Sequence, residues 1–195
     1  MQVTEQRYYT PEEYLELEDY AAYKSEYIDG QIIHIAGGTV NHNQIALNLS
    51  AELNFAFKKQ SYRVYMADIR LWIPEKRIYN YPDVMILVDE PEYFNNRKDI
   101  ILNPQVIIEV LSKSTRTYDR EEKFNAYRTI SSFQEYLLID QNRVYIEQLA
   151  KTGKKQWSWR EYDLEDQAIA LVSVPFEMTL IDLYNKVSFD LNESK

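Results

Sequence analysis

Apolar residues form two nearly continuous runs in the middle of the chain, at residues 79–88 and 105–111, and a third run follows at residues 135–140. Strands with an unbroken pattern of Val, Ile and Leu are covered on both faces of a sheet. We therefore expect these three segments to be central strands. Further strands are predicted within residues 62–73, 143–149 and 156–162.

Helix signals occur before, between and after these runs. Thr10-Pro11-Glu12-Glu13 is a capping box with proline at the first helical position, and it predicts a helix over Pro11–Leu17. Apolar residues recur every fourth position between Asn41 and Lys59, which is typical of an amphipathic helix. Another helix is predicted at Asp119–Ile130, and a short closing helix is predicted from Thr179.

Turn residues complete the pattern. Asp29-Gly30 predicts a tight hairpin turn within residues 24–36. The polar stretch at residues 89–104 predicts a surface excursion, and residues 112–118 predict a loop. The order of elements predicts an α/β (α+β) fold with a mixed central β-sheet flanked by helices.

Composition excludes several classes of protein. The chain has 195 residues, 45% of them hydrophobic, which is enough to bury a core in one domain. It has no cysteine and two histidines, so we expect neither a thiolate nucleophile nor a zinc site. No apolar run reaches the roughly 20 residues that cross a bilayer, and the first residues lack a signal-peptide pattern. We expect a cytoplasmic protein with no membrane association.

The net charge of −9 counts against a strong non-specific DNA binder. A local basic patch could still contact phosphates. Six basic residues are candidates for such a patch: Arg63, Arg70, Arg116, Arg120, Lys123 and Arg128.

Two carboxylates interrupt the apolar runs. Asp83 lies within the first run and Glu109 within the second. Removing an ionised carboxylate from water costs several kcal/mol unless another group compensates it. A shared divalent cation would compensate both, and oxygen ligands suit Mg²⁺ or Mn²⁺. Such a site points to hydrolysis of a phosphodiester. The alternative is that each acid pairs with a Lys or Arg, or reaches solvent at a strand end.

An ordered set of motifs resembles the Uma family of restriction-endonuclease-like proteins, a branch of the PD-(D/E)XK nuclease superfamily. The motifs are Glu26-Tyr27-Ile28-Asp29-Gly30, His42 opening a helix, Pro82-Asp83-Val84, Glu109-Val110-Leu111-Ser112 with Ser114-Thr115-Arg116, Asp119 through Lys123 to Tyr127, and Glu135-Tyr136-Leu137-Leu138-Ile139-Asp140. The resemblance covers about residues 9–149. It implies a single restriction-endonuclease-like domain over residues 1–195, with C-terminal strands and a short helix at 150–195.

The resemblance also implies site residues. Asp83 and Glu109 would be metal ligands, and Glu26 would be the N-terminal acidic residue that completes many of these sites. The superfamily pattern has a lysine two residues after the glutamate, where this chain has Leu111.

Two other lysines could replace the missing one. Lys113 lies four residues after Glu109, about 13 Å along an extended strand. Lys123 lies on the following helix, where the Uma-like pattern also has a lysine, and it could pair with Asp119 at the i,i+4 spacing. We favour Lys123. His42 is a candidate for a catalytic or water-positioning role, although a half-buried structural histidine or a helix cap is the commoner explanation.

The resulting hypothesis is a Mg²⁺-dependent (or Mn²⁺-dependent) endonuclease that acts on DNA, and cutting two strands would suit a homodimer. Two alternatives stay open. One is a catalytically inactive nuclease-fold module that binds nucleic acid or a protein partner. The other is a structural homo-oligomer with an interface formed by some of the 17 tyrosines.

Overall fold

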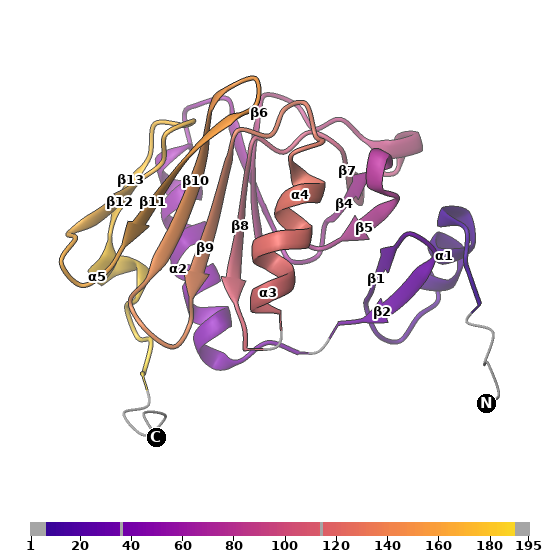
Figure 1. Ribbon diagram of the computed structural model, residues 1–195, viewed down its shortest axis with the longest axis horizontal. Helices are drawn as coiled ribbons and strands as arrows, with labels where there is room; N and C mark the ends of the chain where they lie inside the picture. Colours follow the sequence, from indigo (N-terminus) through magenta and orange to yellow (C-terminus); the bar gives the residue numbers. More distant parts are fainter. Residues whose placement is uncertain (1–6, 36, 114, 190–195) are drawn as a thin grey trace.

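A six-stranded mixed sheet forms the centre of the structure, with helices on both faces (Figure 1). The computed structural model describes residues 7–35, 37–113 and 115–189, so Ser114 of the quoted motif lies outside the described residues. In side-by-side order the central strands are β11 (Gln156–Tyr162), β10 (Ile146–Gly153), β9 (Glu135–Asp140), β8 (Val106–Leu111), β6 (Val84–Val88) and β3 (Tyr62–Met66). Neighbouring strands are antiparallel except β8 and β9, which are parallel. The predicted fold class is confirmed.

Each face of this sheet is covered by a different helix. The helix α2 (Val40–Ala56) covers one face and packs on Ile108 and Val110 of β8. The opposite face carries a continuous helix made of α3 (Arg116–Tyr118), η3 (Asp119–Lys123) and α4 (Phe124–Tyr127). It packs on Ile107 and Leu111. Because successive residues of a strand alternate between faces, Glu109 lies on the α3–α4 side.

A second, five-stranded sheet lies beside the central one. Its strands, in spatial order, are β2 (Gln31–His34), β1 (Ser25–Ile28), β5 (Ile78–Asn80), β4 (Arg70–Ile73) and β7 (Ile100–Ile101). The predicted hairpin turn at Asp29-Gly30 joins β1 and β2, and the predicted N-terminal helix is α1 (Pro11–Glu18) with the full capping box at Thr10. Three fully buried tyrosines form the core between α1 and this sheet: Tyr14, Tyr27 and Tyr79.

The C-terminal part of the chain covers the α2 side of the central sheet. It contains β12 (Ala168–Ala170), β13 (Glu177–Thr179) and α5 (Leu180–Leu183), and Thr179 caps α5 as predicted. Two short 3₁₀ turns, η1 (Pro74–Lys76) and η2 (Phe94–Asn96), lie in loops near the second sheet. Among the described residues, no helix has both the length and the apolar character needed to span a bilayer.

The structure corrects the prediction that residues 79–88 form one central strand. β5 ends at Asn80 in the second sheet, and β6 begins at Val84 in the central sheet. Pro82 lies between them, and proline has no N–H to donate to a strand ladder. The chain therefore crosses from one sheet to the other at this point, and Asp83 precedes its strand.

Other boundaries also differ from the prediction, among them the end of the helix predicted at Asp119–Ile130, which lies at Tyr127. The excursion at residues 89–104 contains β7, whose Ile100 and Ile101 are fully buried and pair in parallel with β4. Two residues are too few to show a strand period. The loop at residues 112–118 ends early, because the helix begins at Arg116. The strand predicted at 143–149 begins at Ile146 and continues to Gly153.

Candidate active site

Asp83 and Glu109 lie on neighbouring segments of the chain. β6 pairs with β8, with Val84 opposite Ile108 at the end of the ladder. Asp83 is the residue just before β6, and Glu109 is the next residue along β8. The backbone N–H of Val110 also donates to Asp83 Oδ2 at 2.7 Å. The sheet therefore brings the two carboxylates near each other, with Glu109 in contact with the α3–α4 helix and Asp83 in contact with His42 of α2.

Glu109 is the most buried of the predicted ligands, with 3% of its surface exposed. Its Oε1 accepts a hydrogen bond from the Tyr127 hydroxyl at 2.7 Å and lies 3.1 Å from Lys123 Nζ. Burial raises the pKa of the Glu109 carboxyl, the Lys123 ammonium lowers it, and the negative charge of Asp83 raises it further. The net shift is upward, so Lys123 and the Tyr127 hydroxyl offset the effect of burial on the Glu109 pKa only in part.

Lys123 is the positive centre of the cluster. Besides Glu109, its Nζ lies 3.0 Å from Asp119 Oδ1 and 4.0 Å from Glu26 Oε1. Burial lowers the pKa of Lys123, but the charges of Glu109, Glu26 and Asp119 outweigh burial, and the pKa lies well above its ordinary value. Lys123 thus makes the i,i+4 ion pair with Asp119 and the contact with Glu109 at once, and it stays protonated at neutral pH.

The helix that carries Lys123 is π-helical at this point. The π segment η3 covers Asp119–Lys123, and π turns inside α-helices are frequent at functional sites. Asp119, Lys123 and Tyr127 recur every four residues, so they share the side of the helix that faces β8. The Tyr136 hydroxyl on β9 donates to the carbonyl oxygen of Asp119 at 3.0 Å. This bond ties the π segment to the central sheet.

Glu26 and His42 enter the cluster from two further elements. Glu26 lies on β1, and burial raises its pKa, an effect that Lys123 partly offsets. His42 lies in the first turn of α2, and its Nε2 is 3.1 Å from Asp83 Oδ2. Burial lowers the pKa of His42, but the hydrogen bond with Asp83 and the negative charge of that residue raise it above its usual value. The backbone N–H of His42 is capped by Thr39, so His42 is not itself the cap.

The remaining candidate lysine lies away from the cluster. Lys113 is exposed in the turn after β8 and forms no hydrogen bond or ion pair with any residue that the structure describes. Leu111, at the position where the superfamily has its lysine, is fully buried against the α3–α4 helix. By contrast, Lys123 lies within 4.0 Å of Glu26, Glu109 and Asp119. Asp83 contacts His42, and its hydrogen bond from the Val110 N–H ties this pair to β8, which carries Glu109.

Three polar side chains near the cluster were not predicted as site residues. Asn80 Nδ2 donates to the Tyr127 hydroxyl at 2.6 Å, and that hydroxyl in turn donates to Glu109. The Tyr118 hydroxyl is buried with no hydrogen-bond partner in the described part of the chain, and its ring centroid lies 5.8 Å from Lys123 Nζ. Tyr127 could have been found from the sequence, because the spacing of four from Asp119 through Lys123 to Tyr127 puts all three residues on one side of the helix. For Asn80 and Tyr118 the sequence offers no comparable signal.

The cluster supplies oxygen ligands without forming a closed cage. Within residues 7–35, 37–113 and 115–189, no three or more His, Asp or Glu side chains are grouped as they would be around a metal ion. Asp83 Oδ2 and Glu109 Oε1 are engaged, whereas Asp83 Oδ1 and Glu109 Oε2 accept no hydrogen bond from a described residue. Mg²⁺ is usually bound through one or two carboxylates, with waters and substrate phosphates completing its shell. The residues present fit a site of that open kind.

Comparison with known structures and proteins agrees with this fold. A crystal structure from Anabaena variabilis, described as that of "a putative nuclease belonging to DUF820", matches with a TM-score of 0.73 and 20% identity, covering 90% of this chain and 97% of that one. At this identity the likeness shows the fold alone. Two proteins of Synechocystis sp., both described as uncharacterized, are similar in sequence. The protein sll1609 is 45% identical over 148 residues, which is 76% of this chain and 84% of that protein. The protein slr1290 is 31% identical over 180 residues, which is 92% of this chain and 93% of that protein.

A family model covers most of the chain. The model Uma2, described as "Putative restriction endonuclease", matches residues 11–183. This match confirms the family that the ordered motifs resembled, and it extends beyond residue 149 to include the C-terminal strands. The chain therefore belongs to the Uma2 family, described as "Putative restriction endonuclease".

Proposed function

We propose that this protein is a metal-dependent endonuclease that hydrolyses DNA phosphodiester bonds. The observation that carries the proposal is the position of Lys123 Nζ, 3.1 Å from Glu109 Oε1 in the cluster that also contains Asp83. Two carboxylates and a lysine are the groups that the superfamily pattern requires. Here the helix supplies the lysine that β8 lacks at Leu111. Membership of the Uma2 family supports the reaction class.

Asp83 and Glu109 would hold the divalent ion, Mg²⁺ or Mn²⁺, through the carboxylate oxygens that described residues leave unengaged. When bound, such an ion polarises a phosphate oxygen and lowers the pKa of a water molecule. His42 fixes the orientation of Asp83 by its contact with Oδ2. The Asn80–Tyr127 pair does the same for Glu109 by occupying Oε1.

Lys123 acts as a fixed positive charge. Its raised pKa keeps the ammonium protonated, so it cannot accept a proton from the attacking water. It orients that water and stabilises the negative charge that develops on the phosphate. Glu26 is the candidate proton acceptor, because its pKa is raised and it lies 4.0 Å from Lys123. Cutting both strands of a duplex needs two such clusters, which two copies of the chain would supply.

Cleavage assays test the proposal. Supercoiled, linear and single-stranded DNA are incubated with the protein and either Mg²⁺ or Mn²⁺. We expect D83N and E109Q to abolish cleavage, and K123Q to reduce it by about 100-fold, as for loss of one stabilising donor. E52Q is the matched control, because Glu52 is exposed on α2 away from the cluster. Equal cleavage by wild type and D83N would remove Asp83 from the mechanism.

A catalytically inactive module on the same fold is the second candidate, and Leu111 in the lysine position is the observation that favours it. Calorimetric titration with Mn²⁺ separates the two. Binding that D83N loses and E52Q keeps supports the enzyme. No binding at millimolar Mn²⁺, together with no cleavage of any DNA form, supports the module.

A further inference from the structure

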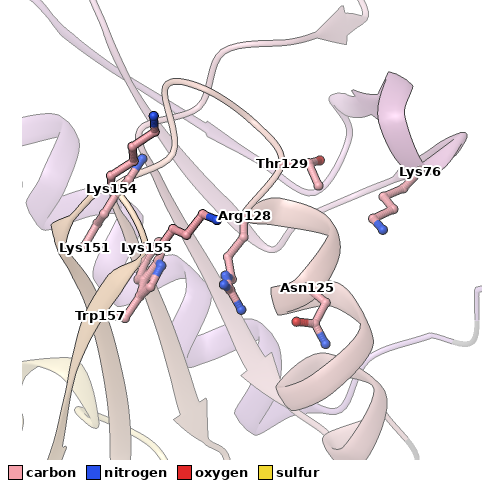
Figure 2. Close-up of a pocket in the computed structure, with 8 residues that line it drawn as sticks. All are labelled: Lys76, Asn125, Arg128, Thr129, Lys151, Lys154, Lys155 and Trp157. Atoms are coloured by element: carbon pink, nitrogen blue, oxygen red, sulfur yellow. The ribbon is translucent and has the colours of Figure 1, made fainter.

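A basic hollow lies at the other end of the helix that carries Lys123. It is formed between the end of α4 and the β10–β11 hairpin, and its volume is about 570 Å³ (Figure 2). Asn125, Thr129 and Trp157 contribute to its wall, and none of its lining residues is acidic. Five cationic side chains line it: Lys76, Arg128, Lys151, Lys154 and Lys155.

These five cations lie together in a chain whose net charge is −9. None of them forms an ion pair with a residue that the structure describes. The basic residues that the sequence suggested as a patch behave differently, since four of them are paired: Arg63 with Glu90, Arg70 with Asp99, Arg116 with Asp140 and Arg120 with Glu147. Lys123 belongs to the carboxylate cluster, so Arg128 alone among the six suggested residues lines the hollow.

The hollow is held in shape by the core beneath it. Trp157 on β11 packs against Phe124 at 5.1 Å and against Phe133 at 5.4 Å between ring centroids. The Arg128 guanidinium lies 5.4 Å from the centroid of the Phe124 ring. The hairpin and the helix are therefore fixed to each other, and Lys155 extends from the hairpin toward Arg128 (Figure 2). Like charges held together in this way repel, and an anion would relieve the repulsion.

We propose that this hollow is a docking site for the phosphodiester backbone of a nucleic acid, separate from the carboxylate cluster. This inference rests on the proposed function for its choice of ligand. The cations come from the η1 turn, the helix end and the β10–β11 hairpin, at separate places around the hollow (Figure 2), and a run of phosphates along one strand can contact all three. Arg128 is five residues from Lys123, about 7.5 Å along the helix axis, so one strand of nucleic acid is long enough to span both sites.

Binding measured without metal tests the inference independently of cleavage. A short fluorescently labelled DNA duplex is titrated with protein in EDTA, and anisotropy is recorded at several salt concentrations. The variant K151Q/K154Q/K155Q removes three cations of the hollow. We expect its Kd to rise at least tenfold and its salt slope to fall by about 0.9 for each lost phosphate contact.

The matched control is K58Q/K59Q/K98Q, which removes three exposed lysines that also lack ion pairs with described residues. It lowers the net charge by the same amount and should bind DNA as wild type does. Circular dichroism checks that both triple variants are folded. The inference would be overturned if the two triple variants weakened DNA binding equally, or if the wild type did not bind DNA. It would also be overturned if poly-glutamate competed for the site as well as unlabelled DNA does, and this last result would indicate an acidic protein partner.

Failure of this inference differs from failure of the proposed function. If wild type binds DNA through the hollow but no DNA form is cleaved, the docking site stands and the endonuclease proposal fails. If E109Q abolishes cleavage while the hollow triple binds DNA as wild type does, the docking site is overturned and the endonuclease proposal stands.

Discussion

Lys123 and Arg128 are cations on one helix, five residues apart, in opposite environments. The Lys123 side chain is 9% exposed and lies within 4.0 Å of three carboxylates. Arg128 lines an open hollow and is unpaired among the described residues. A buried cation costs several kcal/mol unless the fold pairs it, whereas an exposed one keeps its hydration. The difference shows that burial decides which charges stabilise the protein and which are available to a ligand.

The largest effect on stability should come from Lys123. Replacing it in K123M leaves Glu109, Asp119 and Glu26 close together without their cation, so we expect the free energy of unfolding to fall by about 3–5 kcal/mol. Urea denaturation measures this loss. K59M is the control, because Lys59 is exposed, and its effect should stay within about 0.5 kcal/mol.

The double variant K123M/E109Q sharpens this prediction. It removes one of the uncompensated charges, so its loss should be smaller than the sum of the two single losses. A loss equal to that sum would mean that Lys123 and Glu109 stabilise the fold independently, contrary to their 3.1 Å contact.

Tyr127 should have the next largest effect. Y127F removes the hydroxyl that accepts from Asn80 Nδ2 and donates to Glu109 Oε1, and it leaves both buried groups short of a partner. We expect a loss of about 1–3 kcal/mol in the free energy of unfolding by urea denaturation. Y20F is the matched control, since Tyr20 is 93% exposed. A Y127F protein as stable as Y20F would contradict the hydrogen-bonded chain.

The sequence predicted the cluster better than it predicted the cluster's connections. Asp83 and Glu109 could be identified because a carboxylate among Val, Ile and Leu conflicts with its surroundings, and that conflict is visible in the residues themselves. Lys123 could be identified only through the family resemblance. Its contact with Glu109 and the π turn that precedes it depend on how the helix packs on β8, and local spacing does not determine this.

The basic hollow is a second feature that local sequence does not determine. Lys76, Arg128 and the lysines of the β10–β11 hairpin are far apart in the sequence, and only the packing of Trp157 on Phe124 brings the hairpin to the helix. The sequence therefore suggested Arg128 together with five residues that the fold uses elsewhere. The break between β5 and β6, by contrast, could have been predicted from the sequence, because Pro82 interrupts the apolar run.

Arg97 is an intermediate case, a surface cation that the fold does pair. It contacts Asp19 at 2.6 and 2.9 Å and Asp99 at 2.9 Å. Its hydrogen bonds lower the pKa of Asp19. In Asp99 burial raises the pKa, but the hydrogen bonds from Arg97 and the backbone, together with the charges of Arg97 and Arg70, outweigh burial. A carboxyl whose pKa is lowered by folding stabilises the folded state at pH values above its ordinary pKa. This stabilisation is lost as the pH falls through the lowered pKa.

R97Q should therefore differ from wild type mainly at neutral pH. We expect a loss of at most about 1 kcal/mol there, because solvent screens exposed ion pairs. The difference should shrink as pH falls below the ordinary aspartate pKa of 3.8. Urea denaturation at several pH values measures it, and K98Q, one residue away, is the control. A difference that grows as pH falls would reverse the assigned sign.

The smallest effect on stability should come from removing the cations of the hollow, in contrast to the large loss expected when Lys123 is replaced. Because Lys151, Lys154 and Lys155 form no ion pair with described residues, K151Q/K154Q/K155Q breaks none, and it removes mutual repulsion at low salt. We expect its free energy of unfolding to stay within about 0.5 kcal/mol of wild type, with any gain fading as salt is added. A loss above about 1.5 kcal/mol would show that these lysines support the fold. A neutral result combined with weakened DNA binding would show instead that a cation the fold leaves unpaired serves a ligand.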